Sequence, residues 1–363
     1  MSFLNKILNS VKSGQPSSGG VVGIDIGSSS IKVVELQEQK GVITLATYGE
    51  VQLGPYVNEE IGQSVDLHPK QEQRALVDVI RESAVRARDA VFAMPLSSSF
   101  VTNVSIQADA DADLASMVRI EARKVIPASL NEVTLDWAEV EVTKKEVEVN
   151  KEIRRNVLIA SIQNSAIERF DVLMKFAGLN KPPTEIECFS TLRSLYDSQE
   201  DDVAVIDIGA VSAKLYIAKK GLLMRMYRIR SGGVIATEAI AEKMGLDFES
   251  AENKKCLITR KDKDFEIVKK AHDETYNRAF REFNQVIKEY ESKTGANISS
   301  IYLSGGGSSF PGITSQLKAV LDREVILARP FSKVAYPAFM EDTMKQIGPS
   351  FSVALGAALR VLD

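Results

Sequence analysis

Apolar and polar residues alternate in a pattern that predicts two similar β-hairpins far apart in the chain. Val21–Glu35 (VVGIDIGSSSIKVVE) and Val203–Ile217 (VAVIDIGAVSAKLYI) each combine an apolar strand, a tight turn at glycine and a second strand rich in β-branched residues. At a constant offset of 182 residues, seven of fifteen positions are identical, including the Asp-Ile-Gly of both turns. The repeat predicts a duplicated α/β architecture.

Between the hairpins, the periodicity predicts a smaller α+β unit with the order β-α-β-β-α-β. The expected strands lie at 100–106, 133–142, 156–162 and 184–187, and the expected helices at 114–125 and 166–176. We expect this unit, residues 97–188, to be inserted into the first half of the duplication. The first domain would then comprise 21–96, about 189–202 and 333–363, and the second 203–332, with a helical subdomain at about 233–300.

The first twenty residues read as an appended segment and tether. Apolar residues recur at helical spacing within 2–12, and a Gly/Ser/Pro-rich stretch follows at 14–20. Only Lys6 and Lys12 would face lipid charge, which favours a self-packed or frayed terminus over a membrane-surface helix. No apolar run approaches the ~20 residues of a membrane span and no secretory signal is present, so we expect a cytoplasmic protein.

Composition removes several classes of function. With a formal charge of −4 in 363 residues, the chain has no basic excess, so nucleic acid is not an expected partner. Cys188 and Cys256 are far apart and lack a metal-ligand spacing, and we expect buried, reduced thiols. Two histidines, His68 and His272, make a histidine-dependent triad or metal site a poor hypothesis.

Each hairpin turn carries an aspartate, a glycine and hydroxyl side chains in an order that suits phosphate binding. Gly27 and Gly209 let the backbone approach a phosphate, while turn N–H groups and hydroxyls can donate to its oxygens. Asp25 and Asp207 would face each other across a cleft and hold Mg²⁺ through its hydration shell. The remaining candidate phosphate ligands are Ser28, Ser29, Ser30, Lys32 and Ser212.

A third glycine cluster supports a nucleotide site. Gly305, Gly306 and Gly307 follow an apolar strand and precede a helix expected at 313–321. Such a turn lets the backbone lie against a base or a phosphate. One Asp-X-Gly alone is most often only a turn, but two copies in register with this third cluster favour nucleotide binding. Neither GxxxxGK[ST] nor GxGxxG is present, which argues against P-loop and Rossmann folds.

These segments resemble the signature motifs of the actin-like ATPases. IDIGSSSIK, VIDIGAVSAK and IYLSGGGSSFPGI are similar to the phosphate-1, phosphate-2 and adenosine motifs, and SVALGAALRVL is similar to the second connecting helix. EARKVIP and the position of the inserted unit are similar to the PilM family within the FtsA/PilM branch. The resemblance implies a duplicated actin-like (RNase H-like) fold that binds ATP and Mg²⁺. It further implies ribose and adenine contacts from Gly232, Gly233, Glu252 and Lys255.

The PilM resemblance implies an adaptor of the type IV pilus inner-membrane platform. Its nucleotide state would set the conformation of a groove beside the inserted unit. That groove would bind the cytoplasmic N-terminal tail of a PilN-like membrane protein, so membrane association would be indirect; self-association is compatible with the family.

Two other functions stay open at this point. A filament-forming division protein of the FtsA type would usually end in a basic amphipathic helix, whereas this chain ends at Asp363, directly after its expected core helix. A small-molecule kinase of the same fold would need a catalytic carboxylate in a substrate pocket, and no motif marks one. Ala210 and Val211 replace the small residues usual after the second Asp-X-Gly, and no residue is identified that would orient water. We therefore expect at most a slow ATPase.

Overall fold

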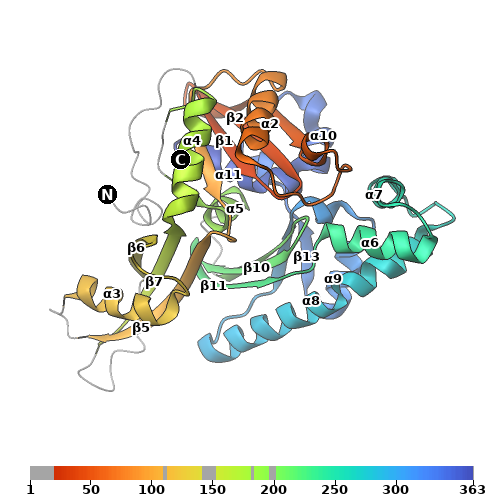
Figure 1. The fold of residues 1–363 in the computed structure, drawn as a ribbon. Coiled ribbons are helices and arrows are strands. Elements are labelled where there is room, and N and C mark those ends of the chain that lie inside the picture. Colours follow the sequence, from red (N-terminus) through yellow and green to blue (C-terminus); the bar gives the residue numbers. More distant parts are fainter. Residues whose placement is uncertain (1–19, 109–112, 141–152, 181–183, 196–201, 363) are drawn as a thin grey trace.

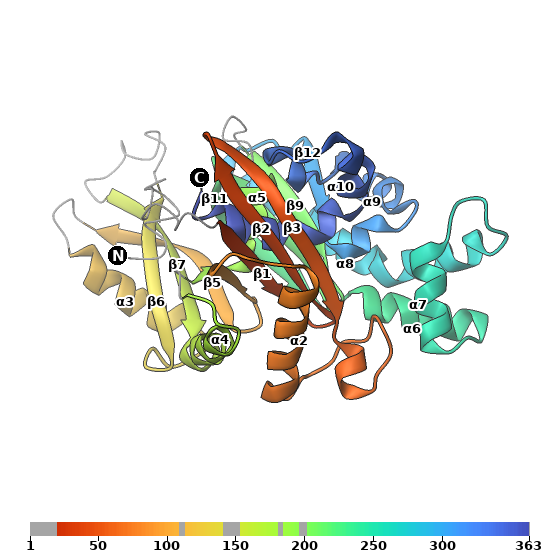
Figure 2. The same ribbon diagram turned by 90° about the horizontal axis from the view of Figure 1, so that it is seen from above.

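The computed structural model describes residues 20–108, 113–140, 153–180, 184–195 and 202–362. It contains two five-stranded sheets of matching topology and a smaller three-stranded sheet. Figure 1 shows the three-stranded sheet at the lower left, and Figure 2 gives the view from above. Both views place this small sheet and helix α7 (Phe248–Leu257) at opposite ends of the molecule.

The first sheet has the strand order β3-β2-β1-β4-β8. Its first three strands pair antiparallel, and β4 and β8 continue the sheet in parallel. Its strands are β1 (Val21–Ile26), β2 (Ser30–Gln39), β3 (Val42–Gln52), β4 (Asp89–Met94) and β8 (Glu185–Ile186). The helices of this domain are α2 (Pro69–Glu82), α5 (Glu187–Leu195), α10 (Glu341–Ile347) and α11 (Ser352–Leu359).

The second sheet repeats this arrangement in the order β11-β10-β9-β12-β13. Its strands are β9 (Asp202–Ile208), β10 (Ala213–Lys219), β11 (Leu222–Ile229), β12 (Ser300–Ser304) and β13 (Glu324–Leu327). The helices are α6 (Gly233–Met244), α7, α8 (Phe265–Thr294) and α9 (Ile313–Leu321). The equal strand order in both sheets confirms the duplicated α/β architecture predicted from the two hairpins.

The successive residues of β1 face opposite sides of the first sheet, and helices cover both sides. Val22 and Ile24 belong to the core that includes residues of α2, whereas Val21 packs with α11 on the other face. Gly23 shares the α11 side, and a Cβ there would lie 1.9 Å from the carbonyl oxygen of Ala354. The glycine therefore allows α11 to lie directly against the strand that carries the first turn.

The inserted unit differs from its predicted β-α-β-β-α-β form. Its sheet contains three strands in the order β5-β7-β6, and α3 (Leu114–Val125) forms a core with it. These strands are β5 (Ser99–Ala108), β6 (Val133–Val140) and β7 (Ile153–Gln163). The fourth predicted strand is wrong for this unit, because β8 pairs with β4 in the first sheet.

Helix α4 (Asn164–Phe176) follows the inserted sheet but packs on the first domain. Phe170 lies edge-on to Phe92 of β4, with ring centroids 5.2 Å apart. Two hydrogen bonds join the Arg169 guanidinium to the buried carboxylate of Glu72 on α2, one of them 2.8 Å long. The inserted unit and the first domain thus share a continuous core.

Two further expectations concern the ends and surface of the chain. The expected N-terminal helix at 2–12 lies outside the described residues. Cys188 is buried as expected, but Cys256 is exposed, so the prediction of two buried thiols is wrong for the second. Among the described helices, none combines the length and the apolar character needed to cross a bilayer.

Candidate functional site

The two repeated hairpin turns have the same backbone hydrogen bond. In the first, the Gly27 N–H donates to the carbonyl of Ser30 over 2.9 Å, and in the second the Gly209 N–H donates to that of Ser212 over 3.0 Å. Strand pairing sets Asp25 opposite Lys32 and Asp207 opposite Lys214. The sequence repeat is therefore also a repeat of local geometry.

The third glycine cluster lies against the second turn because β12 runs parallel to β9, with Ser304 beside Asp207. Gly305 has φ +86°, and a Cβ there would lie 2.4 Å from Oδ1 of Asp207 and 2.4 Å from the carbonyl oxygen of Ile208. Only glycine combines this φ with so close an approach. Gly306, in contrast, faces open space, since a Cβ there would meet no atom within 4 Å.

Three of the four residues predicted to contact ribose and adenine form one hydrogen-bonded group at the start of α6 and on α7: Gly233, Glu252 and Lys255. The Lys255 ammonium donates to the carboxylate of Glu252 over 2.6 Å and to the carbonyl of Gly233 over 3.0 Å. Gly232 has a different role from its neighbour, because a Cβ there would lie 2.4 Å from the carbonyl oxygen of Ala210. Gly232 packs behind the second turn and does not line the cleft.

These segments converge on a cleft of about 750 Å³ between the two halves of the molecule. All site residues predicted from the sequence except Gly232 line this cleft: Asp25, Gly27, Ser28, Ser29, Ser30, Lys32, Asp207, Gly209, Ser212, Gly233, Glu252, Lys255, Gly305, Gly306 and Gly307. Its walls also include Ala210 and Val211, the two bulkier residues of the second turn. The cleft extends to the inserted side, where Pro95, Ser97, Arg169 and Phe170 line it.

Glu187 and Lys214 are among the charged residues of the cleft that sequence reasoning missed. Glu187, at the start of α5, accepts a 2.7 Å hydrogen bond from the Leu96 N–H with one carboxylate oxygen and a 2.7 Å bond from the Lys214 ammonium with the other. Lys214 also contacts Oδ2 of Asp207 at 3.2 Å. The repeat did contain a signal for Lys214, which matches Lys32 at the same offset, whereas Glu187 has no counterpart in any motif.

Burial and neighbouring charges together shift the pKa values of Asp25 and Lys214 in this cleft. Burial raises the pKa of Asp25 to about 6, and although Lys32 opposes this shift, the nearby carboxylate of Glu187 adds to it. Burial alone would lower the pKa of Lys214, but the carboxylates of Glu187 and Asp207 outweigh it and raise that pKa above the ordinary lysine value. The ammonium is therefore charged at neutral pH.

A cluster of three aromatic side chains also lines the cleft. The rings of His272 and Phe310 stack with centroids 3.7 Å apart and planes 11° apart, and Tyr276 lies beside them. Burial lowers the pKa of His272 to about 3, so its imidazole is neutral. The cleft is thus bordered by charged and glycine residues and by a nearly buried, uncharged aromatic cluster.

A sequence profile of the family described as "Type IV pilus assembly protein PilM" matches residues 23–362. The chain belongs to the PilM family. This confirms the resemblance drawn from the phosphate, adenosine and EARKVIP segments.

Solved structures agree on the fold. The structure named "PilM-PilN type IV pilus biogenesis complex" is similar with a TM-score of 0.79 and 24% identity, over 96% of this chain and 100% of that chain. Ethanolamine utilization protein EutJ from Carboxydothermus hydrogenoformans follows with a TM-score of 0.55 and 14% identity, over 98% of this chain and 95% of that one. MreB 5 of Spiroplasma citri, bound to AMPPNP, has a TM-score of 0.51 and 11% identity, over 95% of this chain and 96% of that chain. The predicted actin-like fold is confirmed.

Proposed function

We propose that this chain binds ATP in the cleft between its two halves. The observation that carries the proposal is the convergence of both repeated turns and the Gly305–Gly307 turn on one cleft. The cleft volume of about 750 Å³ is in the usual range for small-molecule sites. Its glycine-lined part, with Lys32, suits a triphosphate.

The oxygen ligands at the cleft are a poor fit for the magnesium ion that the sequence predicted between Asp25 and Asp207. Mg²⁺ prefers six oxygen ligands and keeps several of its waters. Here Oδ2 of Asp207 already contacts the ammonium of Lys214. We therefore assign the nucleotide to the cleft without assigning it a metal.

A substitution at Gly306 tests ATP binding without disturbing the fold. Because a Cβ at this position meets no atom within 4 Å, Gly306→Val should fold normally but place a side chain in the cleft. We expect its ATP affinity, measured by calorimetry, to fall by about tenfold or more, a change of about 1.4 kcal/mol. Equal affinity in the variant and the wild-type protein would refute the assignment.

Within the type IV pilus machinery, we propose that the chain is a cytoplasmic adaptor for a PilN-like inner-membrane protein. Family membership and the fold shared with the PilM-PilN complex support this role. The partner's cytoplasmic N-terminal tail would dock in the groove between the first domain and the inserted unit, at about residues 93–188. Pro95 and Phe170 of this region line the nucleotide cleft, so nucleotide and tail would contact one connected structure.

Photo-crosslinking locates the tail. A synthetic tail peptide with a photoreactive side chain should label residues within 93–188, identified by mass spectrometry, and a scrambled peptide should not. Labelling confined to the helices at 233–294 would contradict the proposed groove. The FtsA-like and kinase alternatives are not favoured by the family match.

We also propose that hydrolysis is slow. Ala210 and Val211 form part of the cleft wall and leave less room beside a terminal phosphate. ATP would then act mainly by favouring one conformation over another. A phosphate-release assay with turnover near ~10 s⁻¹, the median of dedicated enzymes, would disprove this.

A further inference from the structure

Lys214 joins acidic residues from both halves of the molecule. Its ammonium lies 2.7 Å from Oε2 of Glu187, on α5 of the first domain, and 3.2 Å from Oδ2 of Asp207, on β9 of the second. The three side chains are nearly buried, with exposed fractions of 12%, 10% and 8%. All three line the cleft.

The matching lysine of the first hairpin has different contacts. Lys32 is paired in register with Asp25, as Lys214 is with Asp207. Its ammonium, however, donates to the hydroxyl of Ser30 over 2.6 Å and forms a 3.1 Å ion pair with Glu50. The duplicated position thus supplies a lysine to each half, and Lys214 is the copy that bridges acidic residues of the two domains.

A cation placed between two carboxylates in a phosphate-binding cleft has the position that a divalent ion would need. An ammonium supplies one positive charge and three N–H donors. Two donors of Lys214 are directed at Glu187 and Asp207, which leaves a third for a phosphate oxygen. A hydrated Mg²⁺ close to Asp207 would have to displace this ammonium or be repelled by it.

We propose that Lys214 is a resident cation that takes the place of a divalent metal beside Asp207 and Glu187, so that ATP binds with little dependence on Mg²⁺. The inference rests on the proposed ATP binding. It replaces the metal role that the sequence predicted for Asp207. It also gives the two halves a cross-domain ionic link that is present before the nucleotide enters.

Calorimetry with excess Mg²⁺ and with EDTA tests this inference on the full chain. For the wild-type protein, we expect the two dissociation constants for ATP to agree within about threefold, or about 0.65 kcal/mol. Lys214→Met keeps most of the side-chain volume but removes the charge. It should bind ATP at least about tenfold more weakly in EDTA than with Mg²⁺, because the two carboxylates then repel the phosphates unless a metal intervenes.

Two controls separate this effect from a general loss of positive charge. Lys32→Met should weaken ATP binding by the same factor in both buffers, and Lys214→Arg should stay insensitive to the metal. If Lys214→Met does not fold, the wild-type comparison still decides. Wild-type affinity that falls by about tenfold or more in EDTA would overturn the inference and leave the ATP site intact. Absence of ATP binding in both buffers would overturn the proposed function and this inference together.

Discussion

Individual glycines decide how closely the parts of the site approach one another. Gly305 brings the β12 turn against Asp207, and Gly232 brings the start of α6 against the second turn. Both are places where a methyl group would overlap backbone or carboxylate atoms. The neighbouring Gly306 has no such restriction and is open to the cleft.

This contrast predicts that alanine is destabilising at Gly305 and nearly neutral at Gly306. Gly305→Ala introduces strain at φ +86° and a clash with Asp207, and we expect it to lower the free energy of unfolding by about 2 kcal/mol or more. Gly306→Ala is the matched control and should change it by less than about 0.5 kcal/mol. Urea denaturation measures both. Equal stability of the two variants would contradict the described turn.

Asp25 should make stability depend on pH. Its pKa is about 6 in the folded protein against 3.8 ordinarily, so between these values the folded state holds a proton that the unfolded state has released. The free energy of unfolding should therefore fall as pH rises from 4 to 6, by up to about 3 kcal/mol. The Asp25→Asn variant cannot titrate at this position, so its stability should not show this fall. Its melting temperature relative to that of the wild-type protein should therefore rise as the pH is raised from 4 to 6. A difference independent of pH would rule out the raised pKa.

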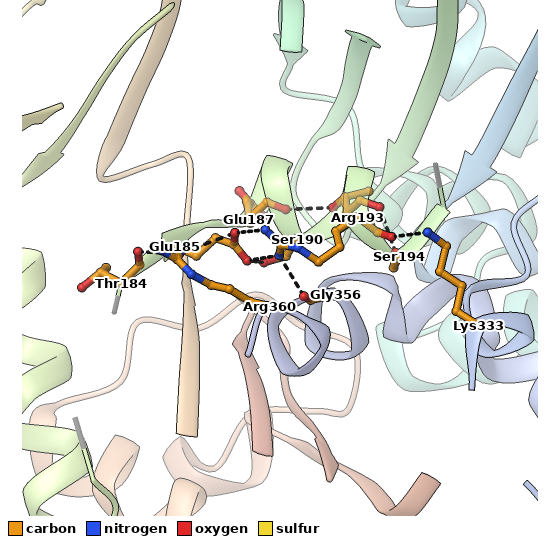
Figure 3. A network of polar contacts seen from close by, with 10 residues as sticks. Thr184, Glu185, Glu187, Ser190, Arg193, Ser194, Lys333, Gly356 and Arg360 are labelled. Carbon is orange, nitrogen blue, oxygen red and sulfur yellow. Dashed lines mark hydrogen bonds and ion pairs between the residues drawn. The ribbon is translucent and has the colours of Figure 1, made fainter. Parts of the chain in front are cut away.

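Among the elements, β8 and α5 connect the inserted unit, the cleft and the C-terminal helix. Figure 3 shows the polar network that holds them. Arg193 makes two 2.5 Å hydrogen bonds to the fully buried carboxylate of Glu185 and a 3.0 Å bond to the carbonyl of Gly356 on α11. Arg360 donates to the carbonyl of Thr184 over 2.7 Å. The network thereby fixes the short segment from Glu185 to Glu187, and Glu187 lines the cleft.

Removal of one partner from this network should be costly. Burial alone would raise the pKa of Glu185, but Arg193 and Arg360 outweigh it and lower that pKa, so the carboxylate is charged. Arg193→Met leaves a buried charge short of its main partner and should lower the free energy of unfolding by about 3–5 kcal/mol. Arg155→Met breaks the more exposed pair with Glu139 and should cost about 1 kcal/mol or less. Chemical denaturation measures both variants. Equal losses in the free energy of unfolding would show that the buried network contributes no more to stability than the exposed ion pair.

At the scale of the whole molecule, the inserted unit is braced against both halves. Arg169 binds Glu72 in the first domain. On the other side, the Asn103 side-chain amide donates to the carbonyls of Leu223 and Met224, at 2.8 and 2.7 Å, where β10 and β11 pair irregularly. A change in the angle between the halves would therefore strain these contacts of the inserted unit.

The two halves of the molecule also approach each other closely beside the cleft. Gly62 of the first domain, with φ +88°, lies so close to α7 that a Cβ there would be 2.6 Å from the carboxylate carbon of Glu252. Glu252 in turn binds Lys255 inside the cleft.

The sequence predicted the parts of this molecule that depend on local pattern. Both hairpins, the Gly305–Gly307 turn and α3 follow from apolar periodicity and turn residues within short windows. The convergence of Glu187 with Lys214 was not predictable, because they meet only when two domains pack. The two residues of β8 carry too little pattern to identify a partner strand. Likewise, the periodicity predicted a helix at 166–176 but not which domain it would pack against.

The coupling of nucleotide to partner is tested most directly by reciprocal binding. The affinity of the PilN-like tail peptide is measured by calorimetry with and without ATP, and the affinity of ATP with and without the peptide. If the cleft and the groove share one conformational equilibrium, each ligand should change the affinity of the other by the same factor, about fivefold or more. Peptide binding that is identical with and without ATP would contradict a nucleotide-dependent adaptor.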